Sequence, residues 1–130
     1  MNKVSGIGGV FFKARDPKAL GAWYEKHLGV QLEDWGGTQF KWRRHDVPER
    51  TGITVWNLFK QESTYFDPGG KSFMVNYIVD DLDAMRAQLL AGGVTVDDKV
   101  EESEYGRFGW ASDPEGNRFE LWEPPRDAGP

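Results

Sequence analysis

Glu120 is the side chain best placed to do chemistry in this sequence, because it lies in an apolar and aromatic run that continues to Trp122. Successive residues of a strand point to opposite faces, so Glu120 and Trp122 share a face. A carboxylate in such surroundings can accept hydrogen bonds from a ligand, or act as a general base if burial raises its pKa. It could equally face solvent, or form an internal ion pair with Lys13 or Arg107.

Other reactive side chains are scarce. The 130 residues include no cysteine, which excludes disulfides, thiolate nucleophiles and thiolate metal sites. There are only two histidines. His27 falls near the end of a predicted helix, where an imidazolium suits the helix dipole. His45 falls in a polar loop, where it is either a surface residue or a contact of a binding cleft.

Two helices and a tight turn are the clearest structural signals. Asp16 followed by Pro17 begins a helix over an amphipathic stripe that ends at Gly29. Asp80-Asp81 begins a second helix, which Gly92-Gly93 ends. The sequence Asp-Pro-Glu-Gly-Asn at residues 113–117 predicts a turn that leads into the strand of Glu120.

Alternating apolar residues predict the strands around these helices. They lie at residues 4–14, 30–33, 38–43, 52–59, 73–79, 94–96, 107–112 and 118–123. The acidic residues 97–104 are expected to form a solvated loop, and a flap hinged at Tyr105-Gly106 is an alternative for its end.

The order strand, helix, three strands occurs twice, which predicts an internal duplication. Asp16 and Asp80 are 64 residues apart (80 − 16), and Trp56 and Trp122 are 66 apart (122 − 56). Residues 61–71, with a Pro-Gly-Gly sequence, form the expected linker between the halves. Each half would form a sheet with one face covered by its helix, and the two uncovered faces would enclose a cleft.

Composition argues against several classes of partner. The net charge is −5, and no basic cluster is larger than Lys41, Arg43 and Arg44, which argues against a nucleic-acid or anionic-membrane surface. No segment approaches the roughly 18 apolar residues of a membrane span, and no signal-peptide core is present at the start. We therefore expect a cytoplasmic protein with neither nucleic acid nor membrane as a partner.

The turn at residues 113–117, the strand with its central Glu120 and the duplicated halves together resemble the vicinal oxygen chelate superfamily. That group includes glyoxalase I, bleomycin-resistance proteins and extradiol dioxygenases. The resemblance implies an α+β fold, with two tandem βαβββ modules that form a half-open, barrel-like cleft. Within a single domain of residues 1–130, we expect module 1 at about 4–60, a linker at 61–71, module 2 at about 72–124 and a tail at 125–130.

The resemblance also identifies the positions that bind a metal ion in metal-using members, one on the first and one on the last strand of each half. Here these positions are Gly9, Thr54, Met74 (or Phe73 after a shift of one residue) and Glu120. Only Glu120 is a suitable ligand, and a catalytic divalent ion needs three or more converging ligands. We expect no cofactor, and a divalent ion bound through Glu120 stays an open alternative.

The residues expected to face the cleft are mostly apolar and aromatic with a few polar groups, which is typical of a small-molecule site. The predicted ligand-binding residues are Phe11, Lys13, Thr54, Trp56, Met74, Asn76, Arg107, Glu120 and Trp122. Trp56 and Trp122 could face each other as stacking surfaces for a ligand, or could fill the cleft as core residues.

The function implied by the resemblance is binding of a small aromatic or amphipathic molecule, as bleomycin-resistance proteins sequester their drug. One alternative is a lyase-, isomerase- or dioxygenase-like enzyme that uses Glu120 as catalytic base or metal ligand. Another is a subunit or regulatory module with a filled cleft. Open sheet edges in so short a chain also predict a homodimer, whose cleft would form within one chain or between two.

Overall fold

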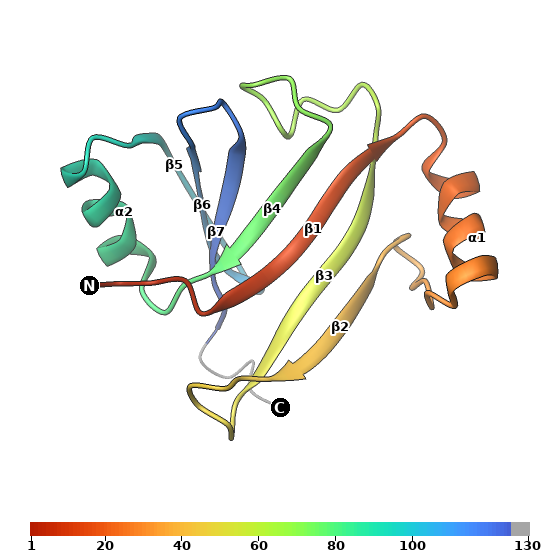
Figure 1. The fold of residues 1–130 in the computed structure, drawn as a ribbon, viewed down its shortest axis with the longest axis horizontal. Helices are drawn as coiled ribbons and strands as arrows, with labels where there is room; N and C mark the ends of the chain where they lie inside the picture. Colours follow the sequence, from red (N-terminus) through yellow and green to blue (C-terminus); the bar gives the residue numbers. More distant parts are fainter. Residues whose placement is uncertain (126–130) are drawn as a thin grey trace.

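The computed structural model describes residues 1–125, and these form two helices and seven strands (Figure 1). In chain order the elements are β1 (Gly6–Ala14), α1 (Pro17–Leu28), β2 (Thr38–Arg43), β3 (Thr51–Lys60), β4 (Phe73–Ile78), α2 (Leu82–Ala91), β5 (Thr95–Ser103), β6 (Gly106–Ser112) and β7 (Arg118–Glu123). All of the predicted tail except Pro125 lies outside the described residues.

The strands form one sheet in the order β2-β3-β1-β4-β7-β6-β5. The antiparallel neighbours β1 and β4 join the two modules, and each pairs in parallel with the last strand of its own module. Helix α1 contacts β1 and β3, whereas α2 contacts β5, β6 and β7, so the helices cover opposite ends of the sheet (Figure 1). This architecture confirms the predicted α+β fold of two related modules. We call the face that contacts the helices the outer face, and the opposite one the inner face.

Both helices begin and end where the sequence predicts. The carboxylate of Asp16 accepts a hydrogen bond from the backbone N–H of Ala19 at 3.0 Å, and Asp81 does the same for Ala84 at 3.0 Å. Gly29 ends α1 with φ of 69°, a left-handed conformation that glycine adopts without steric cost. Because Asp81 rather than Asp80 is the N-cap, the modules are offset by 65 residues (81 − 16).

The strand predicted at residues 30–33 is absent from the structure, so the first module has three strands. The backbone hydrogen bonds of this segment are used elsewhere. The N–H of Val30 donates to Tyr24 at the end of α1, and the N–H of Glu33 donates to Gly37 within a turn. With the first and last of its N–H groups bonded to a helix end and a turn, the segment does not join the sheet.

The acidic segment at residues 97–104 is not the predicted solvated loop, since β5 continues to Ser103. It pairs with β6, and Val100 lies opposite Gly109 after a shift of register. The half-buried Val100 contacts the hydrophobic cluster beneath α2, which gives the strand an apolar face despite its charge. At the predicted hinge, Tyr105 belongs to the tight turn that joins β5 to β6, and Gly106 is the first residue of β6.

The centre of the inner face is closed by the connection between β3 and β4, residues 61–72, which we call the plug segment. Its Phe66 is 1% exposed and packs with Phe11, Met74 and Trp110 from three different strands. The expected linker therefore supplies a core residue of the fold.

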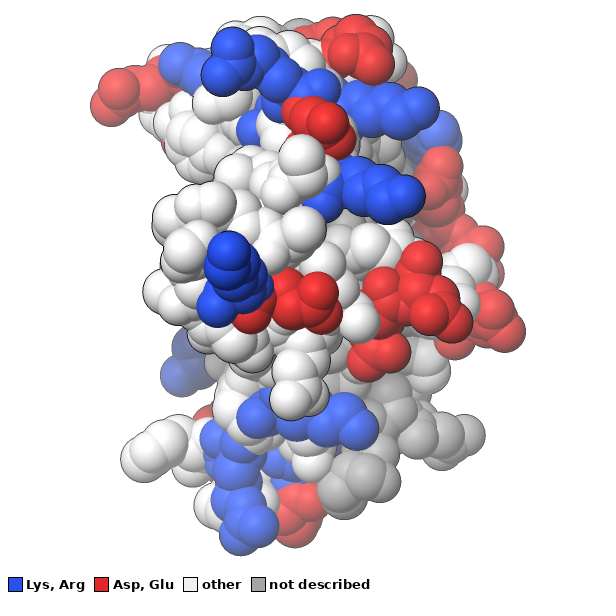
Figure 2. All heavy atoms as spheres, turned by 90° about the vertical axis from the view of Figure 1, so that its right-hand side faces the viewer, with Lys and Arg blue, Asp and Glu red and all other residues white. Residues whose placement is uncertain are grey.

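Within residues 1–125, no helix has the length and apolar character needed to cross a membrane. On the face that carries α1, Lys and Arg side chains are interspersed with Asp and Glu (Figure 2). In this view several Lys and Arg side chains adjoin one another along the upper edge, and Asp and Glu side chains gather on the right.

Candidate functional site on the inner face

The inner face brings together most of the residues predicted to line a cleft. Strand pairing places Phe11 beside Met74, and Asn76 beside Glu120. Lys13 lies on the same face, with its Nζ 5.6 Å from the centre of the Phe66 ring. Six predicted residues therefore share this face: Phe11, Lys13, Met74, Asn76, Glu120 and Trp122.

The predicted face of β3 is wrong. Phe11 pairs with Asn57 in the parallel β1–β3 ladder, so Val55, Asn57 and Phe59 face inward. Trp56 lies on the outer face, where its ring contacts Tyr24 of α1 at a centroid distance of 5.1 Å. Trp56 and Trp122 therefore do not face each other.

Thr54 lies on the outer face as well, where its hydroxyl accepts a hydrogen bond from Trp42 Nε1 at 2.8 Å. Both faces of β3 carry apolar and polar residues, so alternation alone could not decide which one turns inward. The pairing partner decides it.

Arg107 also lies outside the cleft. It donates hydrogen bonds to Asp83 of α2 at 2.9 Å and to Glu102 of β5 at 3.0 Å. The hydrogen bond to Asp83 contributes most to raising the pKa of Arg107, and the same contact lowers the pKa of Asp83. Arg107 therefore links α2 to the β5–β6 hairpin and does not approach Glu120.

Glu120 lies at the centre of a buried hydrogen-bond network. It is 3% exposed and accepts hydrogen bonds from Asn76 Nδ2 at 2.6 Å, from Trp110 Nε1 at 2.9 Å and from the Tyr65 hydroxyl. Burial raises the pKa of Glu120, and these hydrogen bonds act in the opposite direction. The predicted ion pair with Lys13 or Arg107 is wrong, because this carboxylate is held by neutral donors.

Tyr65 and Phe66 of the plug segment are the site residues that sequence reasoning missed. Burial, followed by the neighbouring Glu120 carboxylate, raises the pKa of Tyr65 above its ordinary value. Tyr65 thus holds the segment over Glu120 as a hydrogen-bond donor, and Phe66 fills the space beside it. The sequence does contain one indication of their role, since two adjacent aromatic residues in an otherwise polar linker favour burial of that segment.

The inner face does not provide a donor set for a divalent metal ion. The offset of 65 residues makes Phe11 of β1 equivalent to Asn76 of β4. In the parallel strand pairs Phe11 lies opposite Asn57 and Asn76 lies opposite Glu120, so Asn57 and not Thr54 is the counterpart of Glu120. The implied metal positions become Gly9, Asn57, Met74 and Glu120, which offer one carboxylate and one amide. No group of three or more His, Cys, Asp or Glu residues lies together within residues 1–125.

Neither histidine supplies the missing ligands. The His27 ring packs on Trp23 within α1 at a centroid distance of 4.8 Å, and His45 is exposed in the connection between β2 and β3. The residues present therefore do not fit the metal site that the superfamily implies.

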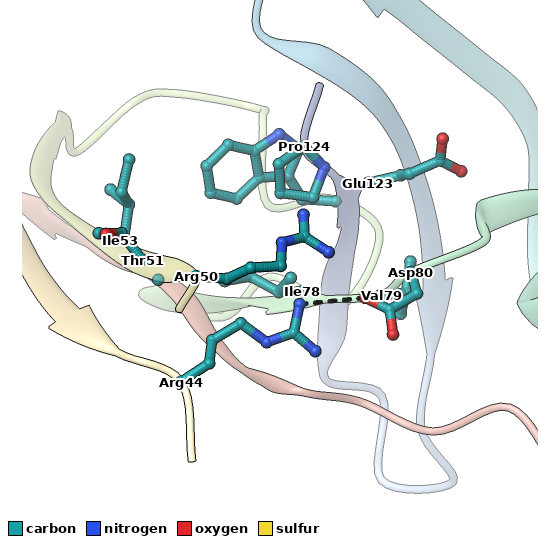
Figure 3. Close-up of a pocket in the computed structure, with 11 residues that line it drawn as sticks. Arg44, Arg50, Thr51, Ile53, Ile78, Val79, Asp80, Glu123 and Pro124 are labelled. Atoms are coloured by element: carbon teal, nitrogen blue, oxygen red, sulfur yellow. Dashed lines mark hydrogen bonds and ion pairs between the residues drawn. The ribbon is translucent and has the colours of Figure 1, made fainter. Parts of the chain in front are cut away.

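A pocket of about 420 Å³ opens at the end of the inner face away from the plug segment, between the start of β3 and the ends of β4 and β7 (Figure 3). It is lined by Arg44, Arg50, Thr51, Gly52, Ile53, Ile78, Val79, Asp80, Trp122, Glu123 and Pro124. We call it the arginine pocket. Of the predicted site residues, Trp122 alone lines it.

One of the two arginines in this pocket is held by two aspartates. Arg44, 5% exposed, donates to Asp46 from Nη2 at 2.6 Å and from Nε at 3.0 Å, and to Asp80 from Nη1 at 3.2 Å. The bond to Asp46 contributes most to raising the pKa of Arg44, and it lowers the pKa of Asp46 to about 2. Figure 3 shows the guanidinium of Arg50 beside that of Arg44 and below Pro124.

Trp122 is a fixed wall of the pocket. Its ring stacks on Phe108 at a centroid distance of 6.0 Å with an interplanar angle of 2°, and its Nε1 donates to the carbonyl of Tyr105 at 2.8 Å. A rigid indole beside aliphatic side chains and a guanidinium can hold a small molecule with a flat or apolar body.

The two paired modules have the architecture of the vicinal oxygen chelate class. The sequence model of one family, described as a glyoxalase-like domain, matches residues 9–122, and the chain belongs to that family. A search of curated proteins by sequence finds no match.

Solved structures show the same fold. A methylmalonyl-CoA epimerase in complex with methylmalonyl-CoA and NH4+ is 17% identical, with a TM-score of 0.69 over 98% of this chain and 100% of that chain. A variant of the Streptomyces coelicolor methylmalonyl-CoA epimerase, in complex with 2-nitronate-propionyl-CoA, is 17% identical, with a TM-score of 0.64 over 92% and 96%. The Mycobacterium tuberculosis enzyme is 21% identical, with a TM-score of 0.57 over 94% and 89%.

Proposed function

We propose that this glyoxalase-like protein binds a small molecule with an aromatic or other apolar body in the arginine pocket. The observation that carries the proposal is the pocket itself, about 420 Å³ beside Trp122, whereas the centre of the inner face is filled by Phe66. This volume lies in the range of roughly 300–1,000 Å³ that small-molecule sites occupy. The acyl-CoA ligands named for two proteins of the same fold support small-molecule binding as a use of this architecture.

Filling the pocket tests this proposal. Ile53 is half-buried at its wall, and Ile53→Trp adds an indole where the ligand's body would lie. We expect ligands found by screening aromatic fragments to bind this variant at least roughly tenfold more weakly, as removal of about 1.4 kcal/mol or more of contact energy predicts. Isothermal titration calorimetry measures the change.

Leu90→Trp is the matched control for this variant. Leu90 is 56% exposed on α2 and does not line the pocket, so it adds the same side chain elsewhere. Equal affinity of both variants and the parent protein for every fragment would show that binding occurs at another place.

The proposal includes a homodimer formed through the outer face. This face exposes apolar side chains on β1, β2 and β4: Ile7 at 39%, Val10 at 36%, Phe40 at 49% and Phe73 at 47%. A second copy of the chain would cover such a patch symmetrically. The pocket lies on the inner face of a single chain, so this dimer would leave it intact.

A charge on this patch is expected to separate the subunits. Phe73→Glu would lose about 1.5–3 kcal/mol of burial in each subunit, which together weakens a twofold dimer roughly hundredfold or more. Sedimentation equilibrium measures the dissociation constant. Leu28→Glu, on a side chain 64% exposed at the end of α1, controls for added charge. A parent protein that sediments as a monomer at micromolar concentration would refute the dimer.

Acid–base catalysis by Glu120 is a second candidate. Its buried carboxylate with a raised pKa favours it. A substrate could reach Glu120 only if the plug segment moved, because Tyr65 and Phe66 cover it. Turnover lost in Glu120→Gln while ligand affinity is kept would favour this candidate over binding alone.

A cytoplasmic location is part of the proposal, and the cysteine-free composition supports it. Cell fractionation with an antibody against the protein would test the location.

A further inference from the structure

We infer that the ligand of the arginine pocket is a monocarboxylate with an apolar body, and that Arg50 binds its carboxylate. This inference rests on the proposed function and names the chemical class of its ligand. Three observations support it: Arg44 is paired with aspartates whereas Arg50 is not, apolar side chains surround the two arginines, and the pocket has no excess of positive charge.

Arg50 is the arginine left available for a ligand. It is half-buried and lines the pocket, yet its side chain forms no ion pair or hydrogen bond with the other residues of the described chain, 1–125. A guanidinium has five N–H donors in a planar fork that matches a carboxylate with two parallel hydrogen bonds. Arg44, by contrast, is occupied by Asp46 and Asp80.

The acidic residues near Arg50 are engaged elsewhere. Asp80 pairs with Arg44 at 3.2 Å, and Glu123 accepts a hydrogen bond from the backbone N–H of Leu82 at 2.7 Å. Figure 3 shows the carboxylate of Glu123 directed away from Arg50. A carboxylate from outside would therefore meet Arg50 without displacing an existing ion pair.

The local charge favours a monoanion over a dianion such as a phosphate monoester. The pocket lining carries two positive charges, from Arg44 and Arg50, and two negative charges, from Asp80 and Glu123. Asp46, which pairs with Arg44, adds a further negative charge, so the group has no positive excess. One planar guanidinium satisfies one carboxylate, whereas a phosphate presents more acceptors and more charge than this group can compensate.

The apolar side chains that line the pocket determine what kind of body the ligand has. Ile53, Ile78, Trp122 and Pro124 place apolar surface beside the Arg50 guanidinium. Because such walls exclude water, the charge–charge attraction is stronger here than at an open surface. An aryl carboxylate would set its ring against Trp122 and direct its carboxylate to Arg50.

A pair of probes that differ in charge alone tests the inference. Calorimetry at pH 7 compares 2-naphthoate with its neutral isostere 2-naphthamide on the parent protein, on Arg50→Gln and on Arg15→Gln. Arg15 is exposed just after β1, at the end of the inner face away from the pocket, so its variant removes the same charge elsewhere. Thermal unfolding of each variant confirms that it is folded.

We expect the parent protein to bind naphthoate at least roughly tenfold more tightly than naphthamide, since a hydrogen bond between a guanidinium and a carboxylate is markedly stronger than one to a neutral amide. Arg50→Gln should reduce the affinity for naphthoate to about that for naphthamide, and Arg15→Gln should retain the preference of the parent protein. Equal affinities for both probes, or a preference that survives Arg50→Gln, would overturn the inference but not the proposed function. Failure of both probes to bind the parent protein would overturn both.

Discussion

Replacing Phe66 by alanine is expected to lower the free energy of unfolding by about 3–5 kcal/mol, the usual cost of truncating a buried phenylalanine. Phe66 is 1% exposed and packs against Phe11, Met74 and Trp110, so truncation leaves a cavity at the centre of the inner face. Chemical denaturation followed by circular dichroism and tryptophan fluorescence measures the change.

Tyr105→Ala is the control for this truncation. Tyr105 is 67% exposed in the turn between β5 and β6, where its loss should change the unfolding free energy by no more than about 0.5 kcal/mol. If Phe66→Ala proved as mild as Tyr105→Ala, the plug segment would not be packed against the sheet in solution.

The substitution Glu120→Leu should be comparably costly, lowering the unfolding free energy by roughly 3 kcal/mol or more. Leucine has a similar volume but removes the acceptor shared by Tyr65, Asn76 and Trp110. Asn76 and Trp110 are each 2% exposed, and each of these two buried donors left without a partner costs about 1–3 kcal/mol. Urea denaturation near pH 7 measures the difference from the parent protein.

Glu120→Gln is the matched variant, because it keeps an acceptor for Trp110 Nε1. The Oδ1 of Asn76 is buried without a partner, so rotation of that amide could offer it to the new Gln N–H groups. We expect a cost well below that of Glu120→Leu. A similar cost for both variants would show that the hydrogen-bond network contributes little to stability.

The parent protein and Glu120→Gln are also expected to differ in how their free energy of unfolding depends on pH. The folded state raises the pKa of Glu120 above its ordinary 4.5, so the folded protein binds this proton more tightly than the unfolded chain. The contribution of Glu120 to stability is therefore fully present below pH 4.5 and declines as the pH rises through the raised pKa. Relative to Glu120→Gln, the parent protein should lose stability over this range and change no further above it.

Sequence patterns predicted the parts of the fold that local chemistry determines. Asp16 and Asp81 cap helices because their carboxylates reach backbone N–H groups three residues ahead, and Gly29 ends α1 because it adopts a positive φ. The face shared by Glu120 and Trp122 followed from alternation along a single strand.

Features that depend on distant pairing could not be obtained in this way. The face of β3 is fixed by its parallel register with β1, in which Phe11 meets Asn57, and neither composition nor alternation encodes that register. The contact of Tyr65 with Glu120 joins residues 55 positions apart, from a segment whose Pro-Gly-Gly sequence indicated only a linker. Arg44 and Arg50 flank an ordinary polar connection, and only the folded sheet brings them beside Trp122.

The most direct test of the central claim is a two-dimensional NMR titration of the tryptophan indole N–H signals with 2-naphthoate. Trp122 lines the open arginine pocket, whereas Trp110 lies 2% exposed beneath the plug segment at the closed centre. Single Trp→Phe variants assign the two signals. We expect the Trp122 signal to shift progressively while that of Trp110 stays in place. A large shift of Trp110 with little change at Trp122 would contradict it, and would locate ligand binding beside Glu120 at the centre of the inner face.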